Sequence, residues 1–137
     1  MKVKNSLYYV LLSELLFTIL PIIILIIYRC YDEQKILIFY NTEWAACAII
    51  LFGQSIVKFS SGISNSNKKF SWQLVSLIIS IIIIMGLIPS ILVLVINIGT
   101  AEKTMGIYLF QLILFALSII CFFIIGAIGQ YLLDEEK

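Results

Sequence analysis

The sequence predicts an all-α integral membrane protein, a bundle of four transmembrane helices that assembles into an oligomer. The 137 residues are 62% hydrophobic and 12% charged, and their mean hydropathy is +1.12. A soluble domain of this size cannot bury so much apolar surface. Four apolar runs are each long enough to cross a bilayer core, which takes about 20 helical residues. The chain therefore forms a single transmembrane domain over residues 1–137.

We expect the helices at about residues 6–28, 42–60, 70–98 and 104–133. The first has a basic start like a signal peptide, but it is longer than one and ends without a cleavage site, so it is retained. Pro21 and Pro89 predict bends in the first and third helices. The last two helices exceed the bilayer thickness and must tilt, kink or project.

Lysine and arginine residues predict the orientation. Lys2, Lys4, Lys58, Lys68, Lys69 and Lys137 fall on one side of the membrane, and Arg29, Lys35 and Lys103 on the other. This distribution of six against three favours both termini in the cytoplasm. We expect a multi-pass protein of the bacterial inner membrane.

The residue types argue against catalysis. There is no histidine, which removes the commonest general base and metal ligand. Cys30, Cys47 and Cys121 are widely spaced, without a CxxC motif, and indicate neither a disulfide framework nor a metal site. We therefore expect no enzyme activity, no metal and no cofactor.

Polar residues within the helices recur on single faces. In the third helix a heptad count from Gln73 meets every polar residue. One interpretation is bundle packing, in which small and self-bonded side chains let helices approach closely. The other is a face turned to an oligomer axis or a water-filled cavity. The candidates for pore lining, gating or ion coupling are Glu14, Thr18, Gln54, Lys58, Gln73, Ser76, Ser80, Ser90, Asn97, Gln111 and Ser118.

Glu14 is the most informative of these residues. It lies about 12 Å into the first helix, counted from Ser6 at 1.5 Å per residue. An ionised carboxylate in lipid is costly, so it must be protonated, paired or in contact with water. Lys58 and Gln54 lie at a comparable depth on the second helix. Glu14 is therefore either a structural partner of these residues or a group for ion passage, proton coupling or gating.

The connection "SSGISNSNKK" before the third helix is basic and flanked by aromatic residues. Lysines and an interfacial aromatic belt are typical of a cytoplasmic membrane boundary. Alternatively, Lys58, Lys68, Lys69 and Trp72 could bind an anion, such as a lipid headgroup or a nucleotide or oligonucleotide signal. Sequence-specific nucleic-acid binding is not expected.

Two resemblances add functional expectations. "SELLFTILPIII", "EWAACAIILFGQSIVKF" and "FFIIGAIGQYL" resemble segments of small multi-pass membrane effectors from bacterial anti-phage defence systems. This resemblance implies a homo-oligomeric channel that permeabilises the inner membrane when released by an operon-encoded regulator or a nucleotide-type signal. "YYVLLSE" and the four-helix layout resemble the small multidrug resistance family, which implies proton and cationic drug binding at Glu14. The chain lacks the Gly- and Pro-rich pattern expected downstream in that family.

The sequence thus favours a homo-oligomeric ion channel that acts as a regulated toxic effector. A proton-coupled exporter using Glu14 is the alternative, and a holin-like or structural membrane subunit is a further one.

Overall fold

The four apolar runs form four helical spans. The computed structural model describes residues 2–32, 35–66, 69–99 and 104–134, and every regular element in this part of the chain is helical. Each span is long and apolar enough to cross a membrane. The predicted all-α fold with four membrane-spanning helices is confirmed.

The third and fourth spans each contain one π-helical turn. In chain order the elements are α1 (Lys2–Tyr31), the 3-10 helix η1 (Lys35–Tyr40), α2 (Glu43–Asn65), α3 (Trp72–Ile82), the π turn η2 (Ile83–Leu87), α4 (Ile88–Gly99), α5 (Met105–Cys121), the π turn η3 (Phe122–Gly126) and α6 (Ala127–Asp134).

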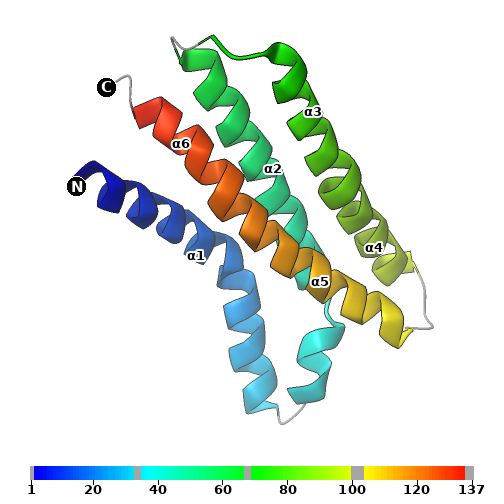
Figure 1. Cartoon of the computed structure of the whole chain (residues 1–137). Coiled ribbons are helices and arrows are strands. Elements are labelled where there is room, and N and C mark those ends of the chain that lie inside the picture. Colours follow the sequence, from blue (N-terminus) through cyan, green and yellow to red (C-terminus); the bar gives the residue numbers. More distant parts are fainter. Residues whose placement is uncertain (1, 33–34, 67–68, 100–103, 135–137) are drawn as a thin grey trace.

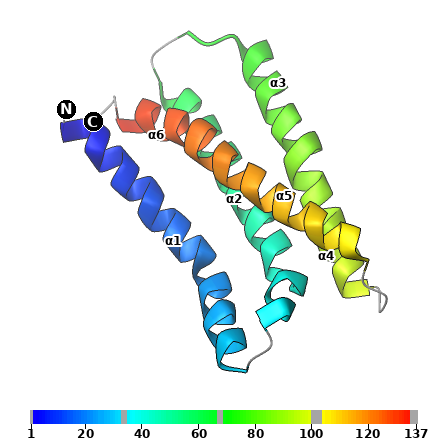
Figure 2. The same cartoon turned by 60° about the horizontal axis from the view of Figure 1, so that its bottom comes forward.

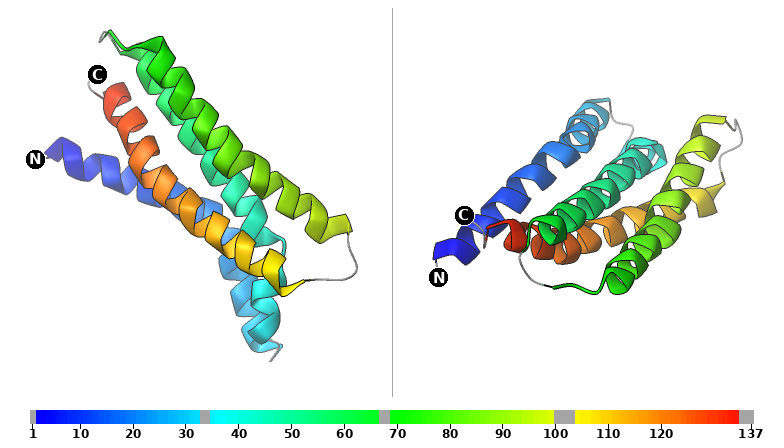
Figure 3. Two further views of the ribbon diagram at one scale, coloured as in Figure 1. Left: turned by 45° about the vertical axis from the view of Figure 1, so that its right-hand side comes forward. Right: turned by 90° about the horizontal axis from the view of Figure 1, so that it is seen from above.

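Helix α2 is the centre of the bundle and packs against each of the other three spans. It runs beside α5–α6, with α1 on one side of this pair and α3–α4 on the other (Figures 1 and 3). The start of α1 and the end of α6 lie at the same end of the bundle as the end of α2 and the start of α3 (Figure 1). An even number of spans requires this placement of the termini.

Helix α2 is longer than predicted. It continues through "SSGISN" to Asn65, whereas the sequence predicted its end near residue 60. The added turns are held by tertiary packing, because Phe59 and Ile63 are buried against Val75 and Leu132. Burial of these side chains outweighs the weak helix propensity of serine, glycine and asparagine.

The backbones of α2 and α6 touch. A Cβ atom added at Gly62 would overlap the backbone of Gly129, and a Cβ atom added at Gly129 would overlap the carbonyl of Lys58. Only glycine permits this approach, in the manner of small-residue interfaces between membrane helices. This contact fixes the position of α6 beside the Lys58 turn of α2.

Both predicted helix distortions are present. Helix α1 contains Pro21 and changes direction near its middle (Figures 1 and 2), because proline lacks the N–H that the preceding turn needs. Before Pro89 the chain forms η2, in which the Ile88 N–H donates to the Ile83 carbonyl. The Ser90 hydroxyl then donates to the Gly86 carbonyl at 2.7 Å.

The turn η2 divides the polar seam predicted on the third span. Before it, Gln73, Ser76 and Ser80 are exposed; after it, Ser90 and Asn97 are buried. A π turn holds one residue more than an α turn, which rotates the following helix by about 100° relative to an unbroken count. The heptad count therefore joined two faces that point in different directions.

Helical spacing also predicts a seam on the fourth span, at Thr104, Tyr108, Gln111, Phe115, Ser118, Phe122, Gly126 and Gly129. The structure buries six of these residues, whereas Phe115 is half-buried and Thr104, before the start of α5, is exposed.

Candidate functional site

An ion pair joins α1 to α2 inside the membrane spans. The Lys58 Nζ atom lies 2.8 Å from Glu14 Oε2 and 3.0 Å from Glu14 Oε1. It also donates to Gln130 Oε1 of α6 at 3.1 Å. The Lys58 side chain is 14% exposed and that of Glu14 is 37% exposed, so the ammonium is the more enclosed partner. The structure thus contains the Glu14–Lys58 contact, which was one of the two interpretations of Glu14 from the sequence.

A ladder of weaker polar contacts continues from this pair along the α1–α2 contact. The Thr18 hydroxyl donates to the Glu14 carbonyl at 2.9 Å and accepts from Gln54 Nε2 at 3.4 Å. Two turns before Gln54 on α2, the Cys47 thiol donates to the Thr18 carbonyl at 3.2 Å. The Gln54 Oε1 atom is buried without a hydrogen-bond partner. An acceptor left in this condition indicates a place where water or a cation would bind favourably.

A groove opens beside the ion pair. It has a volume of about 500 Å³ and is lined by Glu14, Ile50, Gly53, Gln54, Val57 and Lys58. At Gly53 no atom lies within 4 Å of where a Cβ would be, so the backbone itself forms part of the wall. The half-exposed carboxylate of Glu14 therefore adjoins a space large enough for several water molecules.

A second polar cluster lies near the opposite end of the bundle. Gln111 is fully buried and accepts from Asn97 Nδ2 at 2.8 Å. Its own amide donates to the carbonyls of Phe39 at 2.9 Å and Asn41 at 3.1 Å. This cluster joins the third and fourth spans to the chain entering α2. The Gln111 amide uses its oxygen and its N–H donors within the bundle, which is characteristic of a structural network.

The structure separates the remaining predicted pore residues. Ser90 and Ser118 are buried, and each hydroxyl donates to a carbonyl of its own span, at 2.7 Å in both cases. Gln73, Ser76 and Ser80 lie on the outer surface of α3. The eleven candidates thus fall into the ion-pair cluster, the Asn97–Gln111 cluster, the exposed residues of α3 and two serines that bond to their own span. They do not line a common path within one chain.

The predicted anion-binding residues do not converge on one point. Lys58 is engaged by Glu14 and Gln130. Lys69 and Trp72 are exposed and share a hollow of about 330 Å³ at the end of α2, while Lys68 lies outside the described residues. Two of the four residues therefore remain available for an anion at this membrane boundary.

Gln130 and Gly129 are site residues that the sequence interpretation missed. Gln130 accepts a hydrogen bond from Lys58 and so connects a third helix, α6, to the ion pair. Gly129 sets the distance between α6 and the Lys58 turn of α2. The signal in the sequence was the segment "GAIGQ". In it, Gln130 directly follows a pair of glycines spaced by three residues, near the end of the last apolar run. Its pairing with Lys58 depends on the crossing of α2 and α6, which no local pattern specifies.

Among the described residues, no three His, Cys, Asp or Glu side chains come together to hold a metal ion. Comparisons with known protein families, with curated proteins and with solved structures gave no match to this chain. The functional argument therefore depends on the geometry of the site.

Proposed function

We propose that this chain is the subunit of a homo-oligomeric ion channel, in which the Glu14–Lys58 pair holds a polar route between α1 and α2 closed. The observation that carries the proposal is this ion pair, placed within apolar spans and continued by Thr18, Gln54 and Cys47. Ionisable side chains at membrane depth are expensive, and they mark ion pathways and gates.

The contacts of Lys58 explain why the pair suits a gate. Three acceptor atoms surround its ammonium, two on Glu14 and one on Gln130. Opening the pair would expose a carboxylate and the unpartnered Gln54 Oε1 to the groove. Conduction requires acceptors that bind cations weakly enough to release them, and we assign that role to these two oxygen-bearing side chains.

The contacts of Lys58 also make a proton-coupled exporter less favoured than a channel. An exporter of the small multidrug resistance type needs a carboxylate that exchanges protons and cationic drugs, whereas here a lysine of the same chain occupies the carboxylate. The groove beside Glu14 could still admit a cationic drug, and dye uptake tests this alternative.

We further propose that the channel acts in the bacterial inner membrane, with both termini in the cytoplasm, as a triggered toxic effector. This role is supported by the resemblance to anti-phage membrane effectors. Induced expression should then depolarise cells and stop growth when the regulator or signal is supplied. Normal membrane potential under these conditions would favour a structural subunit.

The direct test is current across planar bilayers for the wild type, Glu14→Gln, Lys58→Met and the double variant. Polar contacts in membranes contribute about 0.6–1.7 kcal/mol, so each single change should raise the ratio of open to closed channel roughly 3-fold to 20-fold. Ser13→Ala is the matched control, because in the described part of the chain the exposed Ser13 hydroxyl bonds only to the Val10 carbonyl of its own helix.

Silence of all variants in the bilayer would overturn the channel. If silence is accompanied by dye uptake that is driven by a pH gradient and abolished by Glu14→Gln, the exporter is correct.

A further inference from the structure

We infer that α3 carries the surface through which copies of this chain assemble, with α3 of one copy lying parallel to α3 of the next around an axis along the membrane normal. We call this surface the α3 stripe and define it as Trp72, Gln73, Ser76, Leu77 and Ser80. The inference deepens the proposed function: it rests on the oligomer of that proposal and is independent of conduction.

The first observation is that the stripe runs from the membrane boundary at Trp72 into the apolar span, where its inner hydroxyl faces lipid in the single chain. Gln73, Ser76 and Ser80 are exposed on α3, within a span that is apolar enough to cross a membrane. Ser80 follows Trp72 by eight residues, which is about 12 Å along the helix. A hydroxyl at this depth lies in hydrocarbon, where no water satisfies it.

The second observation is that these polar side chains are not satisfied by their own helix. Four serines elsewhere in the bundle donate to nearby carbonyls, namely Ser13 to Val10, Ser55 to Leu51, Ser90 to Gly86 and Ser118 to Phe115. Within the described part of the chain, no hydrogen bond is formed by the side chains of Gln73, Ser76 or Ser80. Three neighbouring polar groups on one outer face therefore retain their full capacity for a partner.

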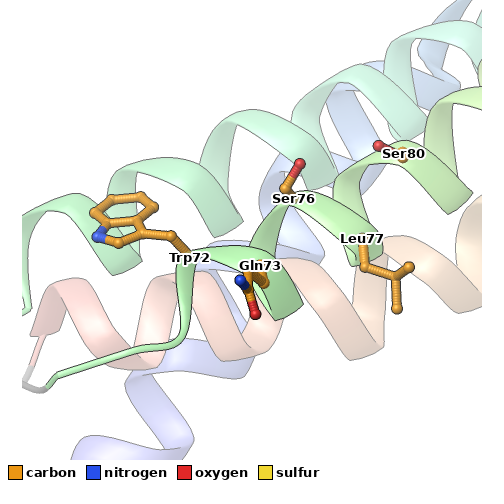
Figure 4. Close-up of a pocket in the computed structure, with 5 residues that line it drawn as sticks. All are labelled: Trp72, Gln73, Ser76, Leu77 and Ser80. Carbon is orange, nitrogen blue, oxygen red and sulfur yellow. The ribbon is translucent and has the colours of Figure 1, made fainter.

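The third observation is the shape of this face. The stripe lines an open hollow of about 540 Å³, and all five side chains come from α3, with the rest of the bundle behind it (Figure 4). Ser76 and Ser80 form a small-xxx-small pair, which lets a neighbouring helix approach closely. The hollow therefore suits a helix whose side chains enter between Trp72 and Leu77.

The chemistry of the stripe indicates that the neighbouring helix is α3 of a second copy of this chain. Copies in one membrane share depth and direction, so rotation about the membrane normal brings Gln73 to Gln73 and Ser76 to Ser76. A glutamine amide carries both donors and an acceptor, and a serine hydroxyl is also both donor and acceptor. Each of these side chains can therefore form a hydrogen bond with the same side chain of a second copy. Such contacts hold membrane helices together.

The turn η2 explains why the stripe points outward at all. Because η2 rotates the helix that follows it, Ser90 and Asn97 turn into the bundle while Ser76 and Ser80 stay outside. One polar seam thus serves two interfaces, one within the chain and one between chains.

Cysteine crosslinking in native membranes tests the contact, on a background in which the exposed Cys30 is replaced by serine. Ser76→Cys and Ser80→Cys should give a crosslinked species of twice the chain mass. Leu74→Cys and Ile81→Cys are matched controls, since both residues are more than half exposed but lie about 100° or more around the helix from Ser76 and Ser80. Equal crosslinking at control and stripe positions, or none at the stripe, would overturn the inference.

A second measurement separates loss of assembly from loss of folding. Combining Gln73→Leu, Ser76→Ala and Ser80→Ala should convert the oligomer in detergent to a monomer of 15.6 kDa. The helical circular dichroism of the chain should be unchanged, because these side chains make no hydrogen bond within the described part of it. An unaltered oligomer mass in this variant would also refute the inference.

The two proposals fail separately. Crosslinking at the stripe together with silent bilayers would refute the channel and leave the contact established. Conduction by a triple variant whose oligomer mass is unaltered would refute the contact and leave the channel.

Discussion

Replacing Gly129 with alanine should separate α2 from α6. The added Cβ would lie 2.6 Å from the Phe59 nitrogen and closer still to the carbonyl of Lys58. Carbon atoms in contact prefer about 3.5–4.0 Å. The overlapped atoms are backbone, so no rotation of a side chain relieves the clash. The helices must move apart by roughly 1 Å, which also stretches the 3.1 Å bond between Lys58 and Gln130.

The expected cost follows from this geometry. Overpacking in a closed interior costs about 1–3 kcal/mol, and the upper half of that range applies because both partners are backbone. Gly53→Ala is the matched control, since no atom lies within 4 Å of its added Cβ. Alanine there should gain up to about 1 kcal/mol from helix propensity. The two variants should therefore differ by roughly 2–4 kcal/mol in free energy of unfolding.

Unfolding by SDS in mixed lipid–detergent micelles measures this difference, with fluorescence of Trp44 and Trp72 as the signal. Gly129→Ala should unfold at lower SDS than the wild type, and Gly53→Ala at equal or higher SDS. Equal midpoints for both variants would show that α2 and α6 do not touch at this turn.

Two further changes probe other contacts. Gln111→Leu leaves the Asn97 amide and two backbone carbonyls without their partner, so the same titration should show a loss of stability of about 1–3 kcal/mol. Asn97→Leu leaves only one acceptor unpaired and should cost less. A Gln111→Leu variant of unchanged stability would contradict the network. In Gly86→Ala the new methyl meets the buried ring of Phe52 and should cost about 1–3 kcal/mol. Adding Phe52→Leu should restore most of that stability, and failure to do so would place the strain elsewhere.

Much of the fold was accessible from local patterns. Runs of apolar residues determined the number and approximate bounds of the four spans, and Glu14 and Lys58 were paired by depth alone. The buried seam of the fourth span followed from helical spacing, as Gln111 and Ser118 show. These features depend on periodicity and solvent, which a single sequence expresses directly.

The rest depends on how helices meet. The end of α2 was wrong because burial of Phe59 and Ile63 overrides the propensity of the intervening residues. The seam of the third span was divided because a π turn before Pro89 adds a residue that no heptad count contains. Gln130 was missed since its partner is set by the crossing of α2 and α6 at Gly129. Crossing geometry arises from three-dimensional packing, which a count along one helix does not reveal.

The central position of α2 has a consequence for biosynthesis. Its mean hydropathy is 1.5, against 2.8–3.0 for the other spans, so it is the least able to enter lipid alone as the chain leaves the translocon. Glu14 precedes it into the membrane, and Gln130 arrives only with the last span. Lys58 should therefore insert against a carboxylate already waiting in α1, and the order of synthesis supplies its partners one at a time.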